Sequence, residues 1–135
     1  MSKGMEVRNM SFKVGQTMTV TGVCKPDAGT FAVNIGLDAE NLAIHLNPRF
    51  NWEGKRNAIV CNCYRDGTWS DEQNHECFPF QQGKEFKIVI QFTQTGFMMK
   101  LCDSSTINFP NHLGANKYTF FSFTEDAHII SIEVK

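Results

Sequence analysis

The sequence predicts an all-β protein in which two antiparallel sheets pack into a sandwich. Three observations predict this fold. Apolar and polar residues alternate in many short segments, turn residues recur about every ten positions, and three turns of capped helix occur nowhere. A chain of 135 residues can bury one core, so we expect a single domain over residues 1–135.

The alternating segments mark the expected strands in chain order. A turn at Gln94-Thr95-Gly96 separates two of them and predicts a hairpin. Other strands are separated by clusters of Gly, Pro, Asn and Asp, which favour turns. We expect strands at residues 17–21, 31–37, 44–50, 59–62, 72–76, 86–93, 97–101, 107–109 and 130–134.

Charge and hydropathy exclude several classes of protein. The net charge of −1 is spread along the chain without blocks of one sign. A nucleic-acid or anionic-membrane partner is therefore not expected. The N-terminal segment has no apolar stretch long enough for a signal peptide, and no later segment is long and apolar enough for a transmembrane helix. We expect a protein that folds in the cytoplasm.

The cysteines indicate neither a disulfide framework nor a metal site. Their number is odd, and their spacings match no paired C-x-x-C pattern. No acidic calcium loop is present either, so we expect no metal and no cofactor. We expect reduced thiols at all five positions: Cys24, Cys61, Cys63, Cys77 and Cys102.

One expected strand, residues 44–50, carries an unusual row of polar side chains. His45, Asn47 and Arg49 share one face, whereas the apolar residues of the segment occupy the other face. Solvated strand faces ordinarily carry Thr, Ser or Lys, so this combination calls for a functional explanation.

Neighbouring segments extend the row if they pair in order as a meander. Asn62, Trp69 and Glu72 then join it on the same face. The combined set offers an aromatic plate, a guanidinium, a carboxylate and several amides. A sugar matches it, because its C–H patch covers an indole and its hydroxyls both donate and accept hydrogen bonds.

The ordered motifs resemble the signature of the galectins, which are β-galactoside-binding lectins. They are H-L-N-P-R-F at 45–50, I-V-C-N at 59–62, W-S-D-E-Q at 69–73, F-P-F at 78–80 and F-P-N at 109–111. The resemblance extends over essentially the whole chain and is strongest to the prototype group, which has one recognition domain. It implies a jelly-roll sandwich that binds lactose and N-acetyllactosamine without catalysis.

The resemblance also implies a role for each residue around galactose. His45, Asn47 and Arg49 would bind the axial 4-hydroxyl, and Asn62 would hold the 6-hydroxyl. Trp69 would stack on the ring. An equatorial 4-hydroxyl would leave the donors and acceptors of the row unpaired, which explains selectivity for galactose over glucose.

The second sugar of the disaccharide would share its 3-hydroxyl between Glu72 and Arg49. This sequence departs from the family pattern nearby. Asn74 stands where many galectins have Arg, and Lys55 stands where many have Asp. Glu53 offers a substitute acid, so we expect an altered second-sugar site around these residues.

The prototype galectins pair through their terminal strands, so we expect a homodimer that cross-links glycans. Candidate interface residues are Met5, Val7, Ile129 and Ser131. Here residues 130, 132 and 134 would face the core, leaving Val7 and Ile129 as apolar groups on the opposite face. The resemblance further implies an extracellular role reached without a signal peptide.

Three other functions fit parts of the sequence. A glycosidase would need two carboxylates, such as Asp71 and Glu72, but strand neighbours point to opposite faces. An intracellular lipid-binding barrel has a similar length but carries a helical lid, which no segment here predicts. A protein–protein interaction module on the galectin fold, with a vestigial sugar site, is the third alternative.

Overall fold

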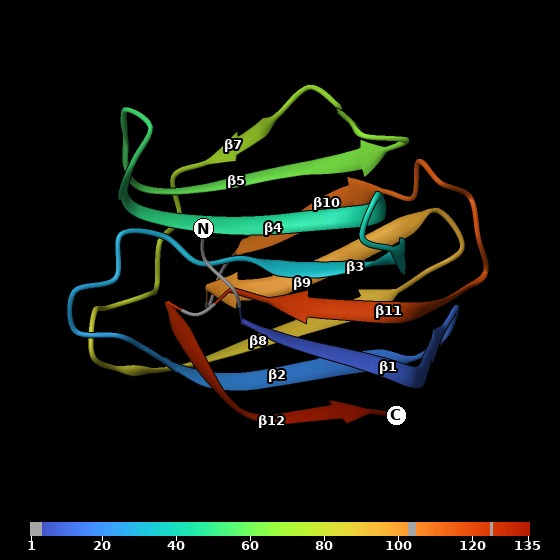
Figure 1. Cartoon of the computed structure of the whole chain (residues 1–135), viewed down its shortest axis with the longest axis horizontal. Coiled ribbons are helices and arrows are strands. Elements are labelled where there is room, and N and C mark those ends of the chain that lie inside the picture. The colour runs from blue at the N-terminus through green and yellow to red at the C-terminus, as the bar shows by residue number, and fades with distance from the viewer. Residues whose placement is uncertain (1–3, 103–104, 125) are drawn as a thin grey trace.

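Two antiparallel sheets face one another in the computed structural model, which describes residues 4–102, 105–124 and 126–135 (Figure 1). The side chains of Cys102 and Ser105 lie outside the described part. All secondary structure in these ranges is β-strand. The predicted all-β sandwich is confirmed.

The larger sheet has the strand order β1-β11-β3-β4-β5-β6, and β7 also pairs with β5. Its strands are β1 (Met5–Lys13), β3 (Val33–Asp38), β4 (Asn41–Trp52), β5 (Lys55–Arg65), β6 (Thr68–Trp69), β7 (Gln73–His75) and β11 (Lys117–Phe123). The smaller sheet has the order β10-β9-β8-β2-β12. Its strands are β2 (Thr17–Cys24), β8 (Glu85–Phe92), β9 (Gly96–Cys102), β10 (Ser105–Pro110) and β12 (Ala127–Val134).

Aromatic side chains fill the space between the sheets. Phe92 stacks on Phe97 and Tyr118, with ring centroids 4.8 and 5.6 Å apart. Phe31 stacks on Phe86 at 4.9 Å. All five are buried in the core, and such ring pairs stabilise the core by more than the burial of their apolar area alone.

Both sheets are open and have edge strands, so the fold is not the closed barrel of an intracellular lipid-binding protein.

The meander expected around the polar row is present. Strands β3, β4 and β5 are neighbours in sequence order, and β7 pairs with β5. In this register His45 lies directly between Asn34 of β3 and Asn62 of β5. Directly opposed residues point to the same face of a sheet, so their side chains can touch.

The strand β11 was not among the expected strands. Phe120 and Phe121 are adjacent and both buried, so apolar residues on the two faces hide the alternation. Phe121 belongs to the core between the sheets, while the guanidinium carbon of Arg8 lies 5.6 Å from the ring centre of Phe120. A strand that is covered on both faces has no period-2 pattern to detect.

The expected orientation of the terminal strands is wrong in one respect. Val7 and Ile129 do not point away from the core: both are partly buried and pack against it. The register of β12 against β2 shifts between Ile129 and Ser131, so the residue between them is bulged. Ile130 is consequently 53% exposed, although the alternation places it in the core.

The cysteines also differ from the prediction. Cys24, Cys61 and Cys63 are buried free thiols, and burial raises the pKa of Cys24 to about 11 and that of Cys61 to about 12. Cys77, in contrast, is disulfide-bonded. The prediction of five reduced cysteines is therefore wrong, and the side chain of Cys102 lies outside the described part.

Candidate carbohydrate-binding site

The six residues of the predicted site come together in one open cleft of about 370 Å³ on the outer face of the larger sheet. This volume is in the range of small-molecule sites. Strand β4 supplies His45, Asn47 and Arg49, and the neighbouring segments supply the rest. The lining consists of His45, Asn47, Arg49, Trp52, Asn62, Trp69, Ser70 and Glu72.

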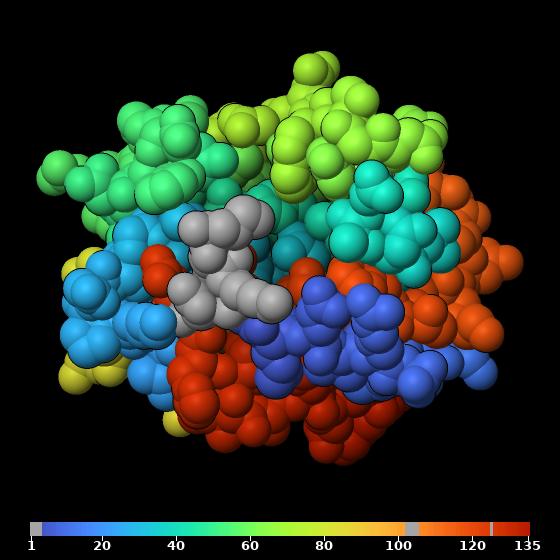
Figure 2. All heavy atoms as spheres, in the orientation of Figure 1, coloured from blue at the N-terminus to red at the C-terminus, as the bar shows by residue number. Residues whose placement is uncertain are grey.

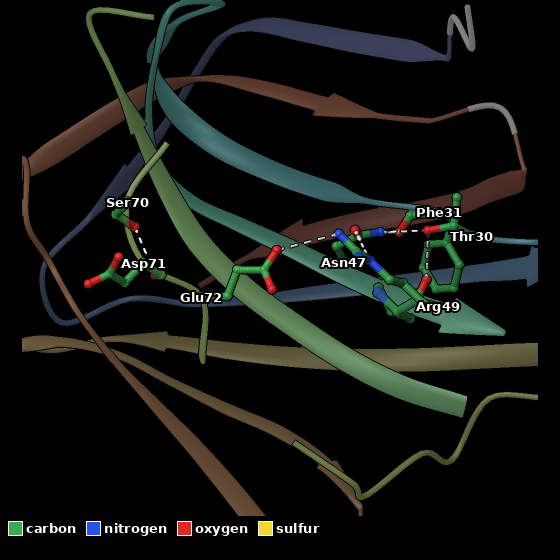
Figure 3. A network of polar contacts seen from close by, with 8 residues as sticks. Thr30, Phe31, Asn47, Arg49, Ser70, Asp71 and Glu72 are labelled. Atoms are coloured by element: carbon green, nitrogen blue, oxygen red, sulfur yellow. Dashed lines mark hydrogen bonds and ion pairs between the residues drawn. The ribbon is translucent and has the colours of Figure 1, made fainter. Parts of the chain in front are cut away.

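A chain of polar contacts holds the guanidinium of Arg49 in place (Figure 3). Its Nε donates to Asn47 Oδ1 at 2.9 Å, and its Nη2 lies 3.8 Å from Glu72 Oε2. Asn47 is itself fixed, because its Nδ2 donates to Thr30 Oγ1 at 2.6 Å and to the Phe31 carbonyl at 2.7 Å. The Arg49 side chain is only 13% exposed, so few of its rotamers remain open before a ligand arrives.

The hydrogen bonds of His45 define its tautomer. Its Nδ1 lies 2.5 Å from Asn34 Oδ1, and the Nδ2 of Asn34 donates to Ser122 Oγ at 3.0 Å. Since Asn34 Oδ1 can only accept, Nδ1 of His45 carries the proton. Burial and the nearby Arg49 charge lower the pKa of His45 to about 4, so the ring is neutral and Nε2 is an acceptor for a ligand hydroxyl.

Trp69 forms the aromatic plate of the cleft. Its side chain is 49% exposed. The Tyr64 ring backs it with centroids 4.4 Å apart, and the His45 ring lies 4.7 Å from it. These contacts fix an exposed indole face next to the acceptor of His45, as a ring with one apolar patch and adjacent hydroxyls requires.

Asn62 carries a buried polar atom that lacks a partner. The residue is 6% exposed, and its Oδ1 has no hydrogen-bond partner among the described residues. A buried acceptor without a partner costs about 1–3 kcal/mol. The amide lines the cleft, so a ligand hydroxyl can supply the missing hydrogen bond.

Asn62→Leu should therefore weaken lactose binding about tenfold without destabilising the ligand-free protein, whose free energy of unfolding should stay equal or rise by about 1 kcal/mol. Calorimetry and urea unfolding measure the two quantities. Asn47→Leu is the matched control: it breaks bonds to Thr30, Phe31 and Arg49 and should destabilise the fold. Equal destabilisation by both substitutions would contradict this role of Asn62.

The cleft differs from the predicted set in some residues. Glu53, Lys55 and Asn74, which were expected near a second sugar, do not line it, and their role in binding stays a prediction. Trp52 and Ser70 do line it. The sequence signal for Trp52 is a tryptophan three residues after Arg49, at the end of the same strand.

The carboxylates do not form a catalytic pair. Glu72 faces Arg49, whereas the Asp71 side chain extends in the opposite direction (Figure 3). Glycosidases need two carboxyl groups that flank one bond.

Within the described ranges, no three side chains of His, Cys, Asp or Glu gather where they could hold a metal ion. In the same ranges, no helix is long and apolar enough to cross a membrane.

The chain is similar to known lectins along its length. The family model described as "Galactoside-binding lectin" matches residues 4–134. A beta-galactoside-binding lectin of Electrophorus electricus is 46% identical over 132 residues, or 98% of each chain. The crystal structure of the Dario rerio galectin-1-L2 matches with a TM-score of 0.93 and 48% identity, over 96% of this chain and 98% of that one.

A further solved relative is CG-16, a homodimeric agglutinin from chicken liver. It matches with a TM-score of 0.91 and 34% identity, over 98% of this chain and all of its own. The chain belongs to the galectin family of galactoside-binding lectins and is a sugar-binding lectin, not an enzyme.

Proposed function

We propose that the protein binds β-galactosides such as lactose and N-acetyllactosamine without a metal ion and cross-links glycans as a dimer. One observation carries the sugar specificity. Asn62, His45 and Asn34 are directly opposed on neighbouring strands. The cleft presents two acceptors: His45 Nε2, opposite the protonated Nδ1, and Asn62 Oδ1, which has no partner among the described residues. The axial 4-hydroxyl and the 6-hydroxyl of galactose supply such donors, while Trp69 covers the apolar face of the ring.

Lactose should bind in EDTA as well as in untreated buffer, with a dissociation constant on the order of micromolar to millimolar. The binding groups are all side chains of the chain itself, so removal of divalent cations changes none of them. Isothermal titration measures this, with glucose and cellobiose as controls that lack the axial 4-hydroxyl. Saturable heat with cellobiose equal to that with lactose would refute the specificity, and no heat with any sugar would favour a protein–protein interaction module.

The dimer proposal rests on two edge strands. Strands β1 and β12 are the outer strands of their sheets, and both run along the same side of the molecule, blue and red in Figures 1 and 2. Exposed apolar side chains lie on both strands: Met5 is 39% exposed and Ile130 is 53% exposed. Unpaired edges with apolar residues favour pairing about a twofold axis, and the related chicken-liver agglutinin is homodimeric.

Sedimentation at micromolar concentration should give about twice the chain mass of 15.3 kDa. Met5→Asp with Ile130→Asp should yield a monomer that binds lactose but no longer agglutinates red cells, because avidity of about 10² to 10⁴ is lost. Leu37→Asp is the matched control, since Leu37 is 49% exposed in β3 and away from this edge. A wild-type monomer at every concentration would exclude the dimer.

A further inference from the structure

The indole of Trp69 lies on a very short strand. Strand β6 has two residues, Thr68 and Trp69, which pair with Arg65 and Tyr64 of β5. The Trp69 side chain is half-exposed. An exposed side chain ordinarily has several rotamers open to it, and a ligand that stacks on only one of them loses affinity because it must order the side chain.

The backbone around Trp69 is fixed on both sides of the residue. Before it, the Asp66 N–H in the turn between β5 and β6 donates to Asn41 Oδ1 at 3.1 Å. After it, the Ser70 N–H donates to the Cys63 carbonyl at 2.9 Å, and the Ser70 hydroxyl accepts a hydrogen bond from the Cys63 N–H at 2.9 Å. The freedom that remains is that of the indole about its own side-chain torsions.

The ring of Tyr64 restricts this freedom. Tyr64 lies directly opposite Trp69 in the pair of β5 and β6, so both side chains point to the outer face of the larger sheet. Their ring centroids are 4.4 Å apart, with 37° between the ring planes, and Tyr64 is partly buried. Aromatic contacts of this kind add stability beyond the burial of apolar area, so Tyr64 favours one orientation of the indole.

Tyr64 differs from the other ring that contacts Trp69. The His45 ring lies 4.7 Å from the indole, with 59° between the planes, and it lines the cleft, where its Nε2 is an acceptor for a ligand hydroxyl. Tyr64 is not among the residues that line the cleft. Any effect of the Tyr64 ring on sugar binding therefore passes through Trp69.

We propose that Tyr64 is a positioning residue, which holds the indole of Trp69 in the orientation on which a galactose ring stacks. The proposal rests on the proposed function, which puts galactose against Trp69. Because the indole is ordered in advance, the sugar does not have to order it on binding, and its C–H face meets a flat surface. The affinity for galactosides is thus set in part by a ring outside the cleft.

Isothermal titration with lactose tests this role through substitutions at position 64. Tyr64→Ala should weaken binding about three- to tenfold, whereas Tyr64→Phe, which keeps the ring, should bind within about twofold of wild type. Tyr64→Leu keeps an apolar side chain without a flat ring, should lose about threefold, and replaces Tyr64→Ala if that variant does not fold. Thr68→Ala is the matched control, because Thr68 is exposed beside Trp69 in β6 and does not line the cleft.

Fluorescence measures the order of the indole directly. The chain has 2 tryptophans, so in a Trp52→Phe background the emission reports Trp69 alone. Time-resolved anisotropy should show more indole motion on the picosecond-to-nanosecond timescale in Tyr64→Ala than in Tyr64→Phe. Saturating lactose should suppress this additional motion, because the bound sugar then orders the indole in place of Tyr64.

The outcomes separate this role from the proposed function. Equal indole motion in Tyr64→Ala and Tyr64→Phe, or lactose affinity in Tyr64→Ala within twofold of wild type, would overturn the positioning role and leave the proposed function intact. A wild type that does not bind lactose, or a Trp69→Ala variant that binds it as tightly as wild type, would overturn both.

Discussion

Arg49→Ala is expected to weaken lactose binding by at least about a hundredfold. Among the described residues of the cleft, Arg49 joins the polar row to the acid: its Nε donates to Asn47 Oδ1 at 2.9 Å, and its Nη2 lies 3.8 Å from Glu72 Oε2. Its removal takes charged donors from the ligand and leaves Asn47 Oδ1 without its partner. Hydrogen bonds to charged groups exceed neutral ones in strength, so the loss is larger than for a neutral contact.

Arg8→Ala provides the matched control for this substitution. Arg8 also pairs with a carboxylate, Glu6, at the shorter distance of 3.1 Å, but its side chain is 68% exposed and does not line the cleft. Exposed ion pairs contribute little to stability or binding. Arg49→Lys should lose about tenfold, because a point charge cannot replace the planar fork. Near-native lactose affinity in Arg49→Ala, measured by calorimetry on folded protein, would show that the assigned geometry is wrong.

Asn34→Asp is expected to make lactose binding strongly dependent on pH, with a loss of about tenfold to a hundredfold at pH 5.5 relative to wild type. In wild type the pKa of His45 is lowered to about 4 by burial and by Arg49. The ring therefore stays neutral, and binding should be flat from pH 8 to about 5. It should fall only as the pH approaches 4, where Nε2 gains a proton and becomes a donor.

A carboxylate at position 34 would stabilise the imidazolium, because it lies against Nδ1 where Asn34 Oδ1 accepts now. The pKa of His45 then rises, so binding is lost at a higher pH than in wild type. Affinity is restored above the new pKa. Titration calorimetry from pH 4.5 to 8 measures both profiles. Ser122→Ala, which removes the far partner of Asn34 and adds no charge, is the control. If the lactose affinity of wild type and of Asn34→Asp depended on pH in the same way, His45 Nε2 would not be the neutral acceptor for the ligand.

The sequence predicts which residues of the cleft lie together because they lie on strands that are consecutive in the chain. His45, Asn47 and Arg49 share one strand, and Asn62 reaches His45 through a hairpin. Alternation decides which face such residues occupy, and a short connection decides which strands pair. These residues line one cleft, and their role in binding a sugar stays a prediction.

The residues that support the cleft from behind are not predicted from the sequence, because they lie on strands that are distant in the chain. Ser122 lies opposite Asn34 only because β11 inserts next to β3, and the apolar residues on both faces of β11 hide it as a strand. Alternation also does not predict the bulge at Ile130 or the exposed position of Trp52, for a different reason. Alternation describes regular pairing over a core, and it ends where the register shifts or the core stops.

The pairing of the termini has a consequence for synthesis of the chain. The first strand, β1, pairs with β11, and β2 completes its pairing only with β12 (Figure 1). The larger sheet therefore stays incomplete until β11 has left the ribosome, and the smaller sheet until β12, Ala127–Val134, has followed it. Contacts so far apart in sequence form slowly, because a long loop must close first. In the nascent polypeptide, β1 lacks its partner and β2 lacks one of its two partners until β11 and β12 emerge, so chaperones that shield apolar strands have prolonged access to these two segments.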